Sequence, residues 1–204
     1  LKHLSNGAAN ILLKYGIKKG DRVMLMLPRI PEWWIFVLAL IKLGVVFCPC
    51  PTMLTPKDIK YRVQAGKFRM IITDSENADK VDQVADACHM LDTLFLVDGE
   101  REGWASYPHE LEYPAPVSHH TVSMPVKKKT RSTDPMMIYF TSGTTGEPKM
   151  VVHDHAYPLG HIVTASLWHD VTANDLHFTF SDTGWAKCAW GKIFGQWIAG
   201  ACIF

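Results

Sequence analysis

Residues 22–50 read RVMLMLPRIPEWWIFVLALIKLGVVFCPC, and two kinds of apolar run alternate in this stretch. The short run at 22–27 predicts a strand. The longer run at 31–43 predicts a helix, because a proline suits its first position. Gly44 ends this helix, and the apolar residues 45–48 predict a second strand. A strand, a helix and a strand at this spacing favour parallel pairing through a right-handed crossover.

The same alternation continues on both sides of this stretch. An amphipathic pattern at Leu4, Ala8 and Leu12 predicts a first helix, and Thr55 followed by Pro56 predicts the N-cap and first position of another. Further strands are predicted at 69–73, 93–97, 136–140, 176–180 and 201–204, with helices at 76–90, 155–168 and 186–198. The sequence therefore predicts an α/β fold of alternating β-α units, with parallel sheets and helices on both faces.

Three segments follow from this alternation. Residues 1–98 are predicted to form a first β/α unit, and residues 135–204 begin a second one. Residues 99–134, which contain four prolines, interrupt the rhythm and are too long for an ordinary connection, so we expect an irregular connecting segment. The chain begins at Leu1 and ends at Phe204 within an apolar stretch, which indicates a fragment of a longer protein.

The composition is that of a soluble globular protein. Of 204 residues, 48% are hydrophobic and 20% charged, and the net charge of +1 argues against a nucleic-acid partner. The apolar run from Trp33 to Leu43 is shorter than the ~20 residues that a membrane span requires. No secretion signal is visible, so a bacterial cytoplasm or a mitochondrial matrix is expected. The sequence carries no signal for an oligomeric state.

Cysteine and histidine residues give no strong metal motif. Cys48-Pro49-Cys50 is a possible ligand pair, but no second pair stands at zinc-ribbon spacing. The five cysteines are better interpreted as buried and reduced. His119-His120 has no Cys or carboxylate close by in the sequence, and we interpret these residues as surface histidines, as we interpret Lys127–Lys129 as a solvated loop.

The segment TSGTTGEPK at 141–149, directly after the strand predicted at 136–140, admits three interpretations. A flexible Gly/Ser/Thr connector is one. A dinucleotide fingerprint or a Walker loop does not fit, because the glycine and lysine spacings are wrong. The third is another kind of phosphate clamp. Its glycines let backbone N–H groups turn toward an anion, its hydroxyls are donors and Lys149 adds a positive charge. Such loops bind ligands at the carboxyl ends of parallel strands, which favours the clamp.

YFTSGTTGEPK resembles the phosphate-binding signature of the AMP-forming adenylating enzymes, which include acyl-CoA synthetases, luciferase-like ligases and peptide-synthetase adenylation domains. The stretches at 31–74, 181–185 and 195–204 also resemble these enzymes, so the similarity covers essentially the whole chain. It implies the N-terminal part of a protein more than twice as long. Met150 after the loop lysine and the Ser-Asp-Thr-Gly-Trp cluster at 181–185 are most similar to medium-chain acyl-CoA synthetases. Acetyl- and propionyl-CoA synthetases share an Asp-x-Gly-Trp.

The resemblance implies a two-step reaction with ATP·Mg²⁺, a short- to medium-chain carboxylic acid and coenzyme A. An acyl-adenylate forms first, and coenzyme A then displaces AMP. The β- and γ-phosphates would be held by Thr141, Ser142, Gly143, Thr144, Thr145, Gly146 and Lys149, in a loop that is mobile until ATP arrives. The catalytic residues, the adenine-binding motifs and the magnesium ligand are expected beyond Phe204, with no metal ligand in this fragment. The fragment alone is therefore expected to have little or no ligase activity.

Trp185 is the candidate for the acyl or adenylate site, with a core tryptophan as the equal alternative. Asp182 is expected to cap the helix that follows it. His155 lies where many relatives carry a histidine, but its neighbours differ from theirs, and His153 and His161 are expected to be surface or packing residues.

Three functions stay open from the sequence. The first is an acyl-CoA synthetase, acting on medium-chain acids or on acetate or propionate. The second is a truncated, non-catalytic nucleotide-binding module. The third is an adenylating enzyme that passes its acyl group to an acceptor other than coenzyme A.

Overall fold

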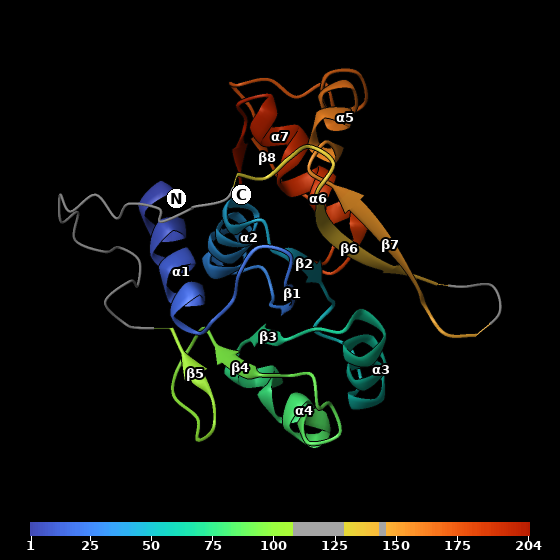
Figure 1. The fold of residues 1–204 in the computed structure, drawn as a ribbon. Coiled ribbons are helices and arrows are strands. Elements are labelled where there is room, and N and C mark those ends of the chain that lie inside the picture. Colours follow the sequence, from blue (N-terminus) through green and yellow to red (C-terminus); the bar gives the residue numbers. More distant parts are fainter. Residues whose placement is uncertain (108–128, 143–145) are drawn as a thin grey trace.

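The structure, a computed structural model, describes residues 1–107, 129–142 and 146–204. These residues form a seven-stranded sheet in the order β5-β4-β3-β1-β2-β6-β7 and a two-stranded sheet of β8 and β9 (Figure 1). The strands are β1 (Arg22–Met26), β2 (Val46–Pro49), β3 (Met70–Thr73), β4 (Thr93–Leu96), β5 (Ala105–Ser106), β6 (Pro135–Thr141), β7 (Lys149–Asp154), β8 (Leu176–His177) and β9 (Cys202–Ile203). The helices are α1 (Lys2–Lys14), α2 (Pro31–Leu43), α3 (Pro56–Gly66), α4 (Ser75–Ala85), α5 (Tyr157–Val163), the π-helical turn η2 (Thr164–His169), α6 (Ala186–Lys192) and α7 (Phe194–Ile198).

Parallel pairing dominates the larger sheet, as predicted. β1 lies between β2 and β3 and is parallel to both, and β6 is parallel to β2 on its other side. The exception is β7, which is antiparallel to β6. This strand was not predicted, although the β-branched Val151 and Val152 favour a strand at this point. The sheet is therefore mixed, with a hairpin at one edge.

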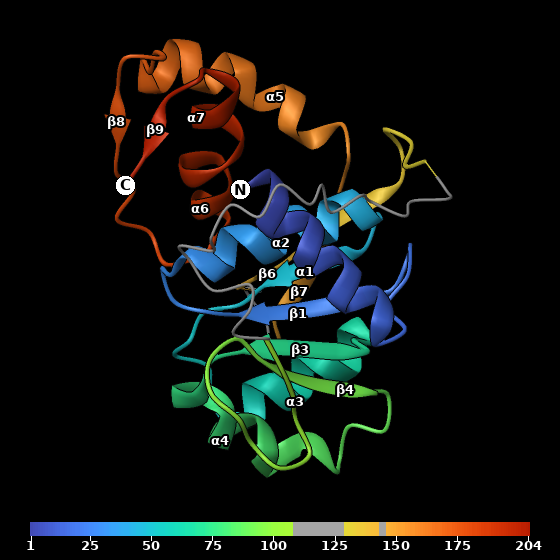
Figure 2. The same ribbon diagram turned by 90° about the vertical axis from the view of Figure 1, so that its left-hand side faces the viewer.

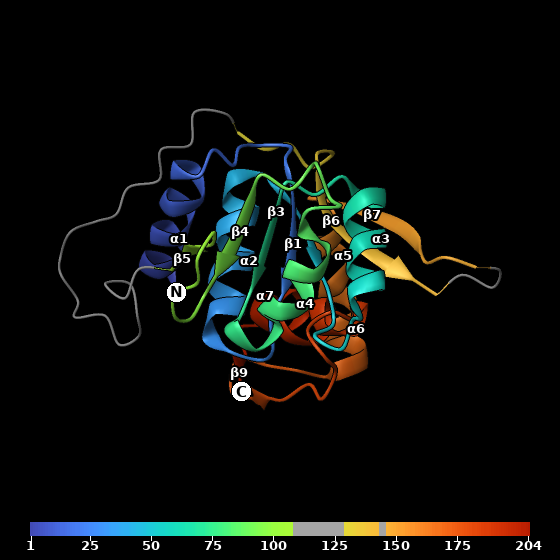
Figure 3. The same cartoon turned by 90° about the horizontal axis from the view of Figure 1, so that it is seen from below.

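Helices cover both faces of this sheet because its strands are apolar on both sides. Along β1, Val23 and Leu25 pack in the cluster that includes α1 and α2, whereas Met24 and Met26 pack in the cluster that includes α3 and α4. Figure 3 shows the two helix pairs on opposite sides of the strands. This is the predicted α/β arrangement, and it explains why the strands read as continuous apolar runs.

Helix α2 lies between residues 157–204 and the strands β1, β3 and β4 (Figures 1 and 2). Figures 1 and 2 both show α5, α7 and β8 in this position, and Figure 2 also shows β9 there. Phe194 of α7 and the buried Cys188 and Ala189 of α6 join the same apolar cluster as α1 and α2. The late part of the chain is thus packed onto its first helices. Among the described residues, no helix is both long and apolar enough to cross a bilayer.

The boundaries of α2 and α3 follow local sequence signals. Pro31 occupies the first turn of α2, and Gly44 ends this helix in a left-handed conformation with φ of 67°. Thr55 caps α3, as predicted. Its hydroxyl accepts a hydrogen bond from the Asp58 amide at 3.3 Å, and the Asp58 carboxylate accepts one from the Thr55 amide at 3.0 Å. This reciprocal pair is a capping box.

We expect Thr55→Ala to loosen the first turn of α3, because the Asp58 amide then loses its acceptor. An N-cap of this kind contributes about 1 kcal/mol, which corresponds to roughly fivefold faster amide hydrogen exchange at Asp58. Exchange measured by NMR or mass spectrometry checks this, with exchange in α1 as the internal control. Unchanged exchange at Asp58 would contradict the capping role.

Several predicted boundaries differ from the structure. The strand predicted at 176–180 is limited to Leu176–His177, which pair with Cys202 and Ile203 of β9. The helix predicted at 186–198 is divided at Ile193, where the backbone leaves the helical region with φ of −129° and ψ of −74°. The predicted irregular segment 99–134 contains β5, and β6 joins the same sheet as β1–β4. The division into segments at 98 and 134 stays a prediction.

Candidate functional site

The hydroxyl-rich segment joins the two strands of the β6–β7 hairpin. Thr141 ends β6 and pairs with Lys149, the first residue of β7, and the Thr141 hydroxyl donates to the Lys149 carbonyl at 3.4 Å. Since β6 is parallel to β1 and β2, this connection leaves the sheet at the edge where their carboxyl ends also lie. Ligands bind at this edge in open α/β sheets. The prediction that the segment follows a parallel strand is confirmed, but an antiparallel strand and not a helix comes next.

Most of the described residues of this loop are exposed to solvent. Thr141, Ser142, Gly146 and Lys149 are all exposed, and Gly146 has φ of 104°, a conformation that residues with a Cβ rarely adopt. The predicted residues Gly143, Thr144 and Thr145 lie outside the described residues. The part of the loop that the structure describes thus offers two exposed hydroxyls, on Thr141 and Ser142, and the exposed ammonium of Lys149.

The Ser181–Trp185 turn lies at the same edge of the sheet. The buried Thr183 hydroxyl donates to the Leu27 carbonyl, directly after β1, at 2.5 Å. Gly184 lies so close to the chain after β2 that a Cβ on it would be 1.9 Å from the Pro51 nitrogen. These two contacts fix the turn above the carboxyl ends of β1 and β2.

Asp182 closes this turn and does not cap the next helix, so the capping prediction was wrong. Its carboxylate accepts the Gly184 amide hydrogen at 2.9 Å, and no side chain caps α6. Short polar side chains often bond the backbone two residues on, which competes with capping. Trp185 occupies the N-cap position of α6 and is 56% exposed. Within this chain Trp185 is therefore not a core residue, and its side chain is exposed at the edge of the sheet where the loop lies.

His155 lies far from the loop. It follows β7, and its amide donates to the Asp134 carbonyl just before β6, at the opposite end of the hairpin. At ~3.4 Å per residue, the hairpin separates it from the loop by roughly 20 Å. Burial lowers the pKa of His155. His161 is buried, with its ring 4.6 Å from that of Tyr157, as expected of a packing residue, and burial lowers its pKa also.

The Cys48 and Cys50 thiols face one another in the core, with their Sγ atoms 3.7 Å apart and both side chains fully buried. Burial raises the pKa of Cys48. Burial also opposes ionisation of Cys50, but the Cys48 thiol and the Arg62 charge together lower its pKa. No group of three or more potential ligands (His, Cys, Asp or Glu) gathers anywhere among the described residues. The five cysteines form no disulfide, and Cys202 is exposed, contrary to the expectation that all five are buried.

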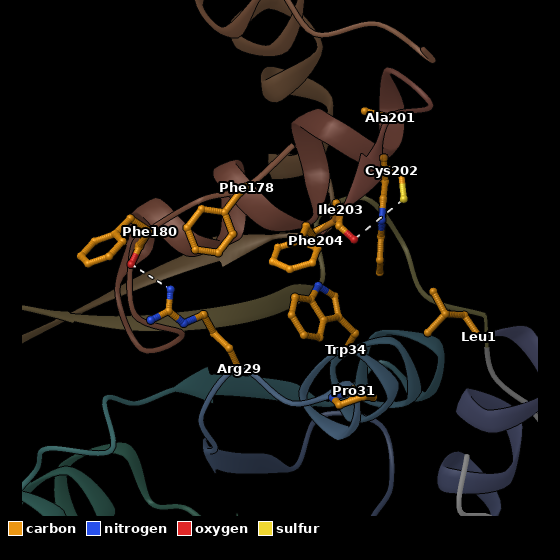
Figure 4. A pocket seen from close by; sticks show the side chains of 11 residues that line it. Leu1, Arg29, Pro31, Trp34, Phe178, Phe180, Ala201, Cys202, Ile203 and Phe204 are labelled. Carbon is orange, nitrogen blue, oxygen red and sulfur yellow. Dashed lines mark hydrogen bonds between the residues drawn. The ribbon is translucent and has the colours of Figure 1, made fainter. Parts of the chain in front are cut away.

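An apolar cavity of about 690 Å³ lies between the amino end of α2 and the β8–β9 segment (Figure 4). The Arg29 guanidinium donates to the Phe180 carbonyl at 3.2 Å and lies 5.8 Å from the ring centroid of Phe178. The cavity is lined by Leu1, Arg29, Pro31, Trp34, Phe178, Phe180, Trp197, Ala201, Cys202, Ile203 and Phe204. None of the described residues predicted for the site is in this lining, which also lacks Trp185.

Two residues of α3 that were not predicted contact the ends of the loop segment. The Tyr61 hydroxyl donates to the Pro148 carbonyl at 2.9 Å, and the Arg62 guanidinium lies 4.8 Å from the centroid of the Phe140 ring. More than seventy residues separate α3 from the loop in the sequence. No local pattern marks these contacts, and only an alignment of related sequences or the fold itself could have indicated them.

Two relatives found by comparison with known proteins are both named mitochondrial acyl-coenzyme A synthetases. The rat mitochondrial acyl-coenzyme A synthetase ACSM4 is 44% identical over 207 residues, and human mitochondrial ACSM3 is also 44% identical over 207 residues. Each alignment covers 100% of this chain and 34% of the relative, so the chain spans about a third of the length of these curated relatives.

Solved structures share the fold. The anthranilate CoA ligase AuaEII in complex with anthranoyl-AMP superposes with a TM-score of 0.85 at 24% identity, over 100% of this chain and 38% of its own. Acetoacetyl-CoA synthetase from Streptomyces lividans gives a TM-score of 0.82 at 21% identity, over 99% of this chain and 32% of its own. The family model of the AMP-binding enzymes matches residues 1–204. The chain, with its hydroxyl-rich hairpin loop at the carboxyl edge of the sheet, belongs to the AMP-binding enzyme family.

Proposed function

We propose that this chain is the N-terminal part of an AMP-forming acyl-CoA synthetase that activates a short- to medium-chain fatty acid. The observation that carries the proposal is the loop at 141–149, whose exposed hydroxyls and lysine extend from the carboxyl edge of the sheet. The membership of the AMP-binding enzyme family and the relatives named acyl-coenzyme A synthetase support it. Because these relatives are named mitochondrial, we further propose the mitochondrial matrix as its location.

In the first step, a carboxylate oxygen of the acid attacks the α-phosphorus of ATP, and pyrophosphate leaves. Negative charge then accumulates on the leaving phosphates, so donors that surround them stabilise the transition state. Thr141 and Ser142 supply hydroxyl donors, and the Lys149 ammonium supplies a charge-assisted one. Gly143, Thr144, Thr145 and Gly146 complete this proposed set. Mg²⁺ would accompany ATP and offset further charge on the phosphates.

In the second step, the thiol sulfur of coenzyme A attacks the acyl carbonyl carbon and loses its proton to solvent, and AMP leaves with the electron pair of the broken bond. Trp185 is the proposed contact for the acyl group or the adenylate. Its exposed ring stands on a turn that two close contacts hold rigidly at the same edge of the sheet as the loop. A flat, rigid side chain at such a place can bound one wall of an acyl site.

The test is acid-dependent pyrophosphate release by the full-length protein, for straight-chain acids from acetate to dodecanoate, with and without coenzyme A. We expect release to be greatest between butyrate and octanoate, with AMP and acyl-CoA as products. A maximum at acetate or propionate would replace the proposed substrate class and keep the mechanism. Release without acyl-CoA formation would indicate a different acceptor. No release with any acid, despite ATP binding, would favour a non-catalytic nucleotide-binding module.

A further inference from the structure

We propose that Tyr61 is a positioning residue for the phosphate loop and that its hydroxyl fixes the loop's exit. This inference rests on the proposed function, because it assigns Tyr61 a role in ATP binding. The residue lies on α3 and is half-buried, and it reaches the loop only through the packing of this helix beside β6.

The contact at the exit is a single hydrogen bond to the backbone. The Tyr61 hydroxyl donates to the Pro148 carbonyl at 2.9 Å, a normal length for a hydroxyl donor. Pro148 directly precedes Lys149, and the peptide group whose oxygen Tyr61 binds also contains the Lys149 nitrogen. The hydrogen bond therefore fixes the backbone from which the lysine side chain extends.

The entry of the loop contacts the same helix. The Tyr61 ring packs against the Phe140 ring with centroids 6.3 Å apart and planes inclined by 67°, and the Arg62 guanidinium covers Phe140 at 4.8 Å. Phe140 directly precedes Thr141. Adjacent residues of α3 thus contact the chain immediately before the first predicted phosphate ligand and immediately before the last one.

The described residues of the loop differ in exposure between its ends and the positions next to them. Thr141, Ser142, Gly146 and Glu147 are exposed, whereas Phe140 and Pro148 are half-buried against α3. A lysine on a fixed backbone loses less conformational entropy when it binds phosphate than one on a free loop. Positioning before binding is how such loops contribute most to catalysis. The Tyr61 hydroxyl is placed to hold the backbone at Lys149 before ATP binds.

Tyr61→Phe in the full-length protein separates this role from simple packing, because it removes the hydroxyl and keeps the ring on Phe140. We expect the KM for ATP to rise about fivefold to tenfold, the effect of losing one hydrogen bond, with the KM for the acid and the thermal midpoint unchanged. Amide hydrogen exchange at residues 149–151 should increase without ATP. The matched control is Tyr15→Phe at the C-cap of α1, where the ring packs against Phe95 far from the loop. The kinetics of this variant should not change.

Two results would overturn the proposal. One is a KM for ATP equal to that of the wild type. The other is a parallel change in every kinetic constant with a lower thermal midpoint, which is what a structural role predicts. If the wild type releases no pyrophosphate with any acid, the proposed function fails. Amide hydrogen exchange then still tests the role of Tyr61. The proposal is supported if Tyr61→Phe needs a higher ATP·Mg²⁺ concentration than the wild type to protect the amides of residues 141–149 from exchange. Equal protection curves for the two proteins would refute it.

Discussion

Replacing Gly184 with alanine is expected to destabilise the protein by about 3 kcal/mol or more, the largest effect that we predict for a single methyl group. The added Cβ would lie 1.9 Å from the Pro51 nitrogen and 2.2 Å from the Cys50 carbonyl carbon. Both neighbours are backbone atoms that cannot rotate away, so the turn or the chain after β2 must move. We expect much less soluble full-length protein and a thermal midpoint lower by roughly 5 °C or more.

Gly160→Ala is the matched control for this variant. A Cβ at Gly160 has no atom within 4 Å, and this residue lies within α5, where alanine is favoured over glycine by up to ~1 kcal/mol. We expect it to preserve or slightly raise the thermal midpoint. Equal midpoints for Gly184→Ala and the wild type would show that the turn does not approach the sheet as closely as described.

Lys149→Ala in the full-length protein is expected to lower kcat/KM for ATP about 10- to 100-fold, because a charge-assisted hydrogen bond to phosphate is lost. The side chain is exposed at the start of β7, so the fold should tolerate the change. Pyrophosphate release measured against ATP concentration checks the prediction. Lys149→Arg, which keeps the charge, should recover part of the activity.

Lys14→Ala removes one positive charge from an exposed position on α1 and serves as the control for net charge. Its kcat/KM for ATP should match that of the wild type. If Lys149→Ala also matched the wild type, while the wild type released pyrophosphate, the assignment of Lys149 to the phosphates would be wrong. The two lysine variants together thus separate a local contact from a general charge effect.

The fold was predictable where the signals are local. The alternation at 22–50, the stop at Gly44 and the cap at Thr55 each depend on neighbouring residues, and the structure confirms all three. β7 was missed because a hairpin strand is defined by its partner, and the β-branched Val151 and Val152 do not by themselves identify β6 as that partner. The helix break at Ile193 has no proline or glycine at that residue to mark it.

The candidate site was likewise predictable only where its residues are neighbours in the sequence. The loop residues from Thr141 to Lys149 are contiguous, so their types and spacing alone suggested an anion site. Tyr61 reaches the loop across many residues of sequence, and no pattern in α3 distinguishes it from a packing residue. Asp182 was misassigned because one carboxylate can serve either a turn or a cap, and only the backbone geometry selects between them.

The strand order also has a consequence for the order of events during synthesis. β1, β2, β3 and β4 are encoded within the first hundred residues, but the outer edge of β2 pairs with β6, which begins more than eighty residues after β2 ends. At ~5–20 residues per second, a ribosome needs roughly ten seconds to deliver that partner. An unpaired apolar strand edge in a nascent chain can recruit other chains. Chaperone binding to stalled ribosomes that carry this protein should therefore peak after β2 emerges and fall once β6 has emerged.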